Sequence, residues 1–350
     1  MLRETIVDCI GKTPLVRLRL DERSVCPVYA KLELLNPFGM KDRVAKRIIL
    51  EAKRRGELAE HAPIIESSSG TMALGVALVG TYLGLEVHIV TDPRIDPLTF
   101  IKLKALGCTV HIVEKMTGHG WQSARLEKLR ELLQQYPGAF WPRQYDNPEN
   151  AYAYQELAQE LLDELDTVDI VVGSVGSGGS LCGTARELRR QNPALKVVAV
   201  DAVGSVIFGQ PDKPGRLQGG LGNSIHPANV DVLVIDEVHW LSDAEAFGAT
   251  VELARQEKIF AGNSSGSVYA VARWLSQTER DGTHIVALLP DRGDRYFTTI
   301  YSEEYREQKG LKNLELPAAP RLVPADAVVE SWSYMELSKG KKRAEVSSGH

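Results

Sequence analysis

Short apolar runs alternate with amphipathic segments along most of the chain. The runs have the length of buried strands, and the segments between them repeat apolar residues every three or four positions, which is typical of helices. In residues 42–55, for example, Val44, Ala45, Ile48 and Ile49 fall on one helical face. Strands are predicted at 28–32, 63–65, 86–90, 109–113, 170–172, 197–200, 232–235 and 285–289, and helices at 42–55, 73–83, 100–105, 121–135, 150–165 and 181–191.

This alternation predicts the fold class. Strands that alternate with helices favour an α/β architecture in which mostly parallel sheets are covered by helices on both faces. One set of units precedes residue 145 or so and a second set follows it, so we expect two lobes with a cleft between them. Beyond Leu316, three prolines punctuate the chain, a short amphipathic stretch covers 326–337, and the final residues have a composition typical of a flexible end.

Composition narrows the class of protein. The 350 residues carry a net charge of −5 with both signs interspersed, which argues against a nucleic-acid partner. No apolar stretch is long enough to span a membrane, and the first residues do not form a secretory signal, so we expect a cytoplasmic protein. The four cysteines have no CxxC spacing, which argues against a metal site or a disulfide framework and favours buried free thiols.

A glycine-rich loop follows the predicted strand at 170–172. Its small residues, Gly173 to Gly183, let the backbone N–H groups face an anion at the start of the next helix. The third position of a dinucleotide-binding GxGxxG is occupied by Leu181, and no GK[ST] follows, so neither nucleotide motif is present. The phosphate that such a loop would hold can belong to a nucleotide or to pyridoxal phosphate, and a plain tight turn is the structural alternative.

Three further segments carry candidate chemistry. Lys41 lies at the start of a predicted helix, where a lysine loses its proton more readily, although its charged neighbours also fit a solvated surface lysine. The segment 66–75 (ESSSGTMALG) places hydroxyls before another helix and suits a carboxylate, or is an ordinary helix cap. The segment 261–268 (AGNSSGSV) has the same two interpretations.

Taken in order, these segments resemble the cysteine synthase and cystathionine β-synthase family of pyridoxal-phosphate enzymes, known as fold type II. The resemblance begins at IGKTPLVRL (10–18) and extends through PDRGDRYFTT (290–299). It implies pyridoxal 5′-phosphate as cofactor, a homodimer, and a large cofactor-binding domain of residues 1–40 and 146–310. Residues 41–145 would form a smaller domain that closes on the substrate, and residues 311–350 a partly flexible C-terminal extension.

The resemblance also implies roles for individual residues. Lys41 is expected to carry the cofactor as a Schiff base and to be the catalytic residue, and Ser264 to hydrogen-bond the pyridine nitrogen. The cofactor phosphate would be held by Gly176, Ser177, Gly178, Gly179 and Ser180. The residues expected to contact the substrate are Ser68, Ser69, Thr71, Met72, Gln144 and Gly220. Thr71 is expected to contact the cofactor as well, and Gly220 lies within QGGLGNS.

Several positions depart from the family pattern near the substrate. Thr71 stands where the family has asparagine, Met72 replaces a hydroxyl, and NPFGMK is one residue shorter than the usual segment before the lysine. Met72 is therefore expected to give the loop an apolar edge. The loops resemble those of branch members that join an amine to an activated serine, as in 2,3-diaminopropionate formation.

The sequence thus predicts β-replacement on serine or an O-activated serine through an aminoacrylate, with sulfide, a thiol or an amine as acceptor. β-Elimination, as in a cysteine desulfhydrase or serine dehydratase, is the first alternative. A non-catalytic scaffold that retains the cofactor and binds a partner through its tail is the second.

Overall fold

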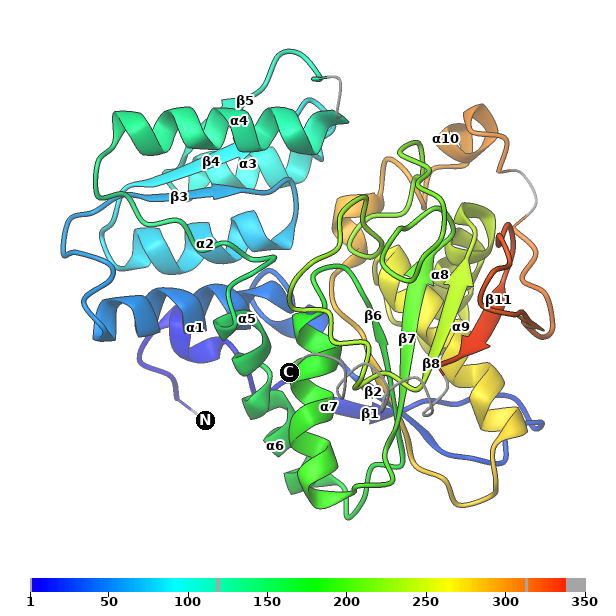
Figure 1. Ribbon diagram of the computed structural model, residues 1–350. Coiled ribbons are helices and arrows are strands. Elements are labelled where there is room, and N and C mark those ends of the chain that lie inside the picture. The colour runs from blue at the N-terminus through cyan, green and yellow to red at the C-terminus, as the bar shows by residue number, and fades with distance from the viewer. Residues whose placement is uncertain (1, 118–119, 312–313, 338–350) are drawn as a thin grey trace, which may run out of the picture.

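The computed structural model describes residues 2–117, 120–311 and 314–337, and these form two lobes, each built on its own sheet (Figure 1). The smaller sheet is parallel and has the order β3-β4-β5. The larger sheet has the order β1-β2-β9-β6-β7-β8-β11-β10, with a parallel centre from β2 to β8. The predicted α/β architecture is confirmed, because helices and parallel strands alternate in both lobes.

In the smaller lobe, α2 lies on one side of the sheet and α4 on the other (Figure 1). Helix α2 is apolar all round because α1 covers the face that the sheet leaves free. The bounds are α1 Lys41–Arg54, β3 Ile64–Ser67, α2 Thr71–Tyr82, β4 Val87–Thr91, α3 Pro97–Ala105, β5 Thr109–Ile112 and α4 Gly120–Gln135.

The remaining elements belong to the larger lobe, except that η1 near the N-terminus contacts α2 of the smaller lobe. The strands of the larger lobe are β1 Leu15–Arg17, β2 Val28–Lys31, β6 Ile170–Ser174, β7 Lys196–Ala202, β8 Glu237–Leu241, β9 Ile285–Leu288, β10 Arg321–Leu322 and β11 Ser333–Glu336. Its helices are α5 Glu149–Tyr152, α6 Gln155–Glu164, α7 Gly179–Gln191, α8 Asp243–Glu257, α9 Asn263–Thr278 and α10 Glu303–Gln308, with 3-10 turns η1 Ile6–Cys9, η2 Glu33–Leu35 and η3 Gly293–Tyr296.

The central strands of the larger sheet are buried on both faces. Successive residues of β6 point to opposite sides, so that Val171 joins one apolar cluster while Ile170 and Val172 join another. The first cluster continues into the smaller lobe through Val44, Ile48 and other residues of α1. The two lobes therefore share one apolar core, which fixes the elements on either side of the cleft.

Two predicted elements are wrong. The apolar run 232–235 forms turns, and the strand begins five residues later as β8. This strand was hidden because its charged residues are paired inside the protein, where Glu237 contacts both His239 and Lys196. The helix predicted over 150–165 is divided into α5 and α6 at Tyr154, whose buried hydroxyl donates to the Met40 carbonyl at 3.4 Å.

The C-terminal extension packs on the larger lobe as part of its sheet. Strand β11 pairs antiparallel with β8, and Trp332 is only 3% exposed. The Trp332 backbone N–H donates to Glu245, and its indole N–H donates to the Nδ1 atom of His239 at 3.2 Å. The terminal stretch predicted to be flexible, residues 339–350, lies outside the described residues.

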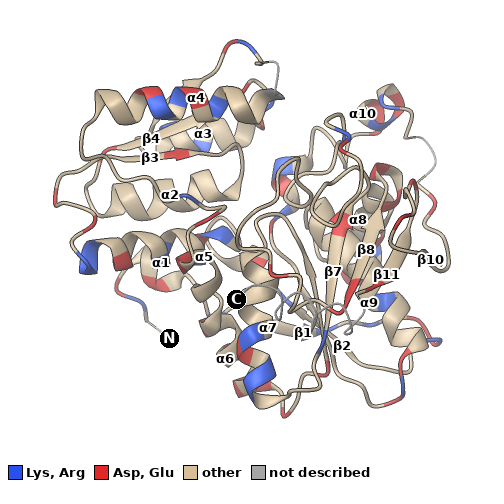
Figure 2. Cartoon of the chain, in the orientation of Figure 1, with Lys and Arg blue, Asp and Glu red and all other residues tan. Residues whose placement is uncertain are grey.

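Charged residues of both signs are spread over both lobes (Figure 2). No helix in the described ranges is long and apolar enough to cross a membrane. Of the cysteines, Cys26, Cys108 and Cys182 are buried free thiols as expected, whereas Cys9 is exposed.

Trp332→Ala is expected to lower the free energy of unfolding by about 3–5 kcal/mol, because it removes a large buried side chain. Val328→Ala, in the same segment but 57% exposed, is the matched control and should change it by less than about 0.5 kcal/mol. Chemical denaturation of both variants measures the difference. Equal effects of the two substitutions would show that the extension does not stabilise the larger lobe.

Candidate active site

Four helices whose first residues lie near one another between the lobes begin without a side-chain cap. The N-cap residues of α1, α2, α7 and α9 are Met40, Gly70, Gly178 and Gly262, and none of them provides a side-chain hydrogen bond. Helices α3, α8 and α10 are capped by the side chains of Asp96, Ser242 and Ser302, whereas α5 and α6 also lack a side-chain cap. Uncapped N–H groups and the helix dipole favour anions, so the cleft can receive negatively charged ligands.

Lys41 is the first residue of α1 and is partly buried, with its side chain directed toward the glycine loop of the larger lobe. Its Nζ atom donates to Ser177 Oγ at 3.0 Å, which brings the predicted lysine and the glycine loop together. Within the described part of the chain, no ion pair is formed by this amine. Burial therefore lowers the pKa of Lys41 to about 8, so a substantial fraction of the amine is uncharged near neutral pH and can attack a carbonyl.

The glycine loop from Gly176 to Ser180 joins β6 to α7. Gly178 has a φ of 85°, and its missing side chain leaves space that the backbone of Val230 fills, since a Cβ atom there would lie 2.7 Å from Val230 N. Among the described residues, the backbone N–H groups of Gly176, Ser177 and Gly178 meet no acceptor. The loop therefore offers unpaired donors, as an anion cradle requires.

Ser264 lies in the first turn of α9, close to both the glycine loop and the QGGLGNS segment. A Cβ atom on Gly220 would lie 3.6 Å from Ser264 Oγ, and one on Gly176 would lie 3.0 Å from the Gly220 carbonyl oxygen. Ser264 Oγ is 3.5 Å from the buried Asp291 carboxylate, which also accepts from Tyr296 and Arg295. The predicted phosphate loop, pyridine partner and Gly220 are therefore neighbours.

The serine segment before α2 is held from behind by side chains of the smaller lobe. Ser68 Oγ accepts from the Gly70 N–H, whereas Ser69 Oγ contacts Thr91 at 2.8 Å and Arg125 Nη1 at 2.6 Å. Gln144 Nε2 donates to the Ser67 carbonyl at 3.4 Å.

Thr71 faces the lysine side of the cleft. A Cβ atom on Gly39 would lie 3.3 Å from its methyl group, two residues before Lys41. The other first-turn residue of α2, Met72, points away. Its side chain is 2% exposed and packs in the apolar core, so the expectation that Met72 gives the loop an apolar edge is wrong. Apolar packing of α2 against its neighbours fixes that orientation, and only the Met72 backbone N–H remains available to a ligand.

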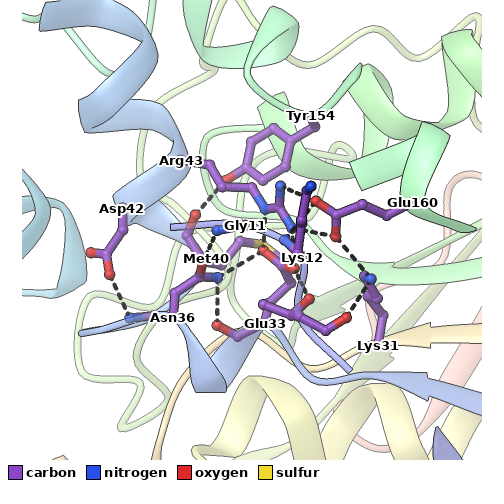
Figure 3. Close-up of polar contacts among 12 residues, drawn as sticks. Gly11, Lys12, Lys31, Glu33, Asn36, Met40, Asp42, Arg43, Tyr154 and Glu160 are labelled. Atoms are coloured by element: carbon purple, nitrogen blue, oxygen red, sulfur yellow. Dashed lines mark hydrogen bonds and ion pairs between the residues drawn. The ribbon is translucent and has the colours of Figure 1, made fainter. Parts of the chain in front are cut away.

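A buried charge network surrounds Arg43, which follows Lys41 by two residues (Figure 3). Arg43 forms bidentate pairs with Glu33 and with Glu160, at distances between 2.7 and 2.9 Å. Lys31 also contacts Glu160 at 2.9 Å. Although burial alone would raise the pKa of Glu160, hydrogen bonds from Arg43 and Lys31 lower it to about 2.

A second set of hydrogen bonds, made by Asp42, also fixes the start of α1. Asp42, buried beside Lys41, accepts from the backbone N–H groups of Phe38 and Gly39 at 2.7 and 3.3 Å. Burial raises the pKa of Asp42 to about 7. Helix α1 is therefore anchored on both sides of its first turn, and Lys41 points toward Ser177.

These groups fit the expected cofactor. The buried amine of Lys41 suits an aldehyde, the unpaired N–H groups of the glycine loop suit a phosphate, and Ser264 offers a neutral hydroxyl to a ring nitrogen. The structure thus brings the predicted residues into one cleft, and their individual roles stay predictions.

Sequence reasoning missed several residues of this cleft. Asn150 donates to Ser177 Oγ at 3.1 Å, and its own Oδ1 atom is buried without a partner in the described structure. Arg125 reaches Ser69 from α4, and its Nε atom is likewise buried and unpartnered. Asn150 belongs to NPEN and Asp291 to PDRGDRY, so these motifs carried a signal, whereas nothing in the sequence around Arg125 marks it.

Comparisons with known proteins agree with this geometry. A family profile described as pyridoxal-phosphate dependent enzyme matches residues 6–291. The chain is 42% identical to an N-(2-amino-2-carboxyethyl)-L-glutamate synthase from Ralstonia nicotianae, covering 87% of this chain and 91% of that protein. It is 37% identical to a synthase of the same name from Cupriavidus metallidurans, covering 93% and 99%. An O-acetylserine dependent cystathionine β-synthase from Helicobacter pylori superposes with a TM-score of 0.79 at 31% identity, covering 86% and 100%.

Reduction of the cofactor-loaded protein with sodium borohydride is expected to fix pyridoxal phosphate on the peptide that contains Lys41. Mass spectrometry of a proteolytic digest locates the adduct. Lys41→Ala should remove it, whereas Lys46→Ala, on the same helix, should retain it. An adduct that persists on another lysine in the Lys41→Ala variant would contradict the assignment.

The buried network predicts acid sensitivity. Because the folded pKa of Glu160 lies below its ordinary value of 4.5, its contribution is complete above that pH and is lost as the pH falls toward 2. Over that window the wild type should lose up to about 3 kcal/mol more stability than Glu160→Gln. Denaturation between pH 6 and pH 2.5 measures this, with the exposed Glu156→Gln on the same helix as control. Parallel curves for the wild type and Glu160→Gln would refute it.

Proposed function

The chain belongs to the family of pyridoxal-phosphate dependent enzymes, and within it we propose that the protein joins the amino group of L-glutamate to the β-carbon of an activated serine. The observation that carries this proposal is the identity of 42% and 37% to two N-(2-amino-2-carboxyethyl)-L-glutamate synthases over nearly their whole length. Solved relatives such as cysteine synthase support the broader assignment, β-replacement on a serine-derived substrate.

The overall reaction exchanges one bond at the β-carbon. The Cβ–O bond of the activated serine breaks, and a bond forms between Cβ and the glutamate nitrogen. The leaving group departs as phosphate or acetate, and the proton lost by the amine is released or taken up by the leaving group. The product carries a 2-amino-2-carboxyethyl group on glutamate, as the names of the two relatives describe.

The cofactor supplies electron withdrawal, which makes the α-proton of a bound amino acid acidic. Lys41 is the residue placed to take that proton at Nζ, because its pKa of about 8 lies close to the working pH of a general base. Ser177 Oγ, 3.0 Å away, orients the amine. Asn150 in turn donates to Ser177, so the hydroxyl orientation is itself set by a buried group.

The substrate carboxylate is assigned to the serine segment and the start of α2. Ser68 and Ser69 provide hydroxyls there, and the uncapped helix provides backbone N–H groups with a favourable dipole. The side-chain amide of Gln144 donates a hydrogen bond to the Ser67 carbonyl and so holds the residue that precedes this segment. This arrangement orients the amino acid by its carboxylate and leaves the β-carbon free to react.

Arg125 favours a strongly anionic substrate. Its guanidinium is 12% exposed, contacts Ser69, and shares the carboxylate of Asp92 with Arg94 at 3.4 and 2.9 Å. Two cations therefore meet one carboxylate. Burial also raises the pKa of the neighbouring Glu66 to about 7, which reduces its negative charge. The resulting positive excess beside the substrate segment suits a phosphate leaving group better than an acetate.

The test combines O-phosphoserine or O-acetylserine with L-glutamate, sulfide or other amino acids, and identifies the products by mass spectrometry. We expect N-(2-amino-2-carboxyethyl)-L-glutamate, with one phosphate released for each product molecule from O-phosphoserine. Faster formation of cysteine from sulfide would replace the proposal with a cysteine synthase. Pyruvate as the main product would replace it with β-elimination.

Arg125→Gln should lower kcat/KM for O-phosphoserine roughly 10- to 100-fold, since it removes a charged hydrogen-bonding group worth about 1.5–3 kcal/mol. The loss for O-acetylserine should be smaller. Arg130→Gln, exposed on the same helix, is the matched control. Equal losses for the two substrates would show that Arg125 supports the fold of the serine segment and does not select the leaving group.

Assembly and location remain part of the proposal. We expect a homodimer in the cytoplasm, as the resemblance and the composition imply. Size-exclusion chromatography with light scattering and cell fractionation test the two expectations.

A further inference from the structure

A pocket of about 650 Å³ lies on the larger lobe, where α8, α9 and the chain following α10 meet. It is built from the C-terminal halves of α8 and α9, whereas the active site uses the first turn of α9. On α9 the lining runs from Ala270 to Gln277, which lie six and thirteen residues after Ser264, or about 9 and 20 Å along the helix. No residue of the lining belongs to the candidate active site. The pocket is therefore separate from the cleft that holds Lys41.

Arginines dominate the described lining of this pocket. The lining contains Arg23, Arg255, Arg273 and Arg306 and the carboxylate of Glu252. Arg23 is 70% exposed and pairs with Asp21 at 2.7 Å, so the charge available to a ligand comes from the other three arginines. Glu252 pairs with Arg273, whereas Arg255 makes no ion pair among the described residues. The pocket wall thus carries an excess of positive charge that its own carboxylate does not neutralise.

Arg306 has N–H donors that form no hydrogen bond with the described residues. Its side chain is 14% exposed, and its contacts in the described structure are the Ile300 carbonyl at 3.2 Å and Glu303 at 3.9 Å. Glu303 is 89% exposed, so it neutralises the charge weakly. A guanidinium has five N–H donors in a planar fork that matches carboxylate and phosphate oxygens. Arg306 therefore presents unused, partly desolvated donors.

The walls of the pocket are set by close packing. A Cβ atom on Gly248 would lie 2.6 Å from the Leu314 carbonyl oxygen, so α8 and the extension touch at a position that only glycine allows. Opposite, Trp274 packs edge-on against Trp332, with ring centroids 6.5 Å apart. Trp332 is anchored by its hydrogen bonds to Glu245 and His239. The concave shape thus exists before any ligand arrives, which lowers the cost of binding.

We propose that this pocket binds a small multivalent oxyanion, a polycarboxylate or a phosphorylated metabolite, between Arg255, Arg273 and Arg306. Its volume falls in the range of metabolite sites, and Trp274 provides a flat wall for the carbon skeleton of the ligand. The proposal does not depend on the reaction catalysed at Lys41.

Isothermal titration calorimetry of the cofactor-loaded enzyme tests the proposal, with citrate as the carboxylate probe and pyrophosphate as the phosphate probe. At least one probe should bind, and Arg306→Gln and Arg255→Gln should each weaken it tenfold or more. Arg190→Gln, an exposed arginine on α7, is the matched control. Retention of β-replacement activity in the pocket variants shows that they fold.

Arg125→Gln separates this pocket from the active site. Binding that is weakened by Arg306→Gln and unaffected by Arg125→Gln belongs to the pocket. Binding with the opposite pattern belongs to the active site and would overturn the proposal. The proposal is also overturned when neither probe binds the wild type, or when both pocket variants bind as tightly as the control.

Discussion

The buried side chain of Arg43 is the constraint on which the catalytic geometry depends. A guanidinium that is 1% exposed must meet carboxylates, and Glu33 and Glu160 satisfy it through four hydrogen bonds. Glu33 belongs to the N-terminal segment and Glu160 to α6, so one side chain joins three stretches of chain. Removing Arg43 would leave the buried Glu33 carboxylate without its cation, at a cost of about 3–5 kcal/mol. Since Arg43 follows Lys41 by two residues, the same contacts fix the direction in which the lysine points.

The cleft is destabilised locally so that ligands can be bound there. Helices α2, α7 and α9 begin at glycines, which give up the capping hydrogen bond that Ser242 provides for α8. A glycine in place of a capping side chain costs only a few tenths of a kcal/mol for each helix, roughly 1 kcal/mol for the three together. Lys41, Asn150 and Arg125 add buried polar groups whose hydrogen bonds are incomplete. The shared apolar core of the two lobes and the Arg43 network offset this cost.

Local sequence patterns predicted the architecture well because most strands are buried and apolar. They failed at β8, where Glu237 and His239 look polar in the sequence but neutralise each other in the core. They also failed at α5 and α6, because one helical period continues across the break at Tyr154. In the candidate active site, Lys41 and the glycine loop could be found because each lies within a local sequence motif. Arg125 could not be found in this way, since its position depends on how α4 packs over β3, which no local pattern records.

Helix α1, which begins at the expected domain boundary, contacts both lobes. Its apolar face packs on α2, yet its charged face is bound to the larger lobe. Arg47 and Arg55 both pair with Glu149 of α5, in addition to the contacts of Arg43. Lys41 therefore keeps its place relative to the glycine loop through ion pairs on the larger lobe, while the serine segment and Arg125 are held by the smaller sheet. The groups that would hold the cofactor are thus fixed by the larger lobe, and those that would select the substrate are fixed by the smaller lobe. Substitutions at Arg125 or Ser69 can therefore alter substrate choice without displacing Lys41.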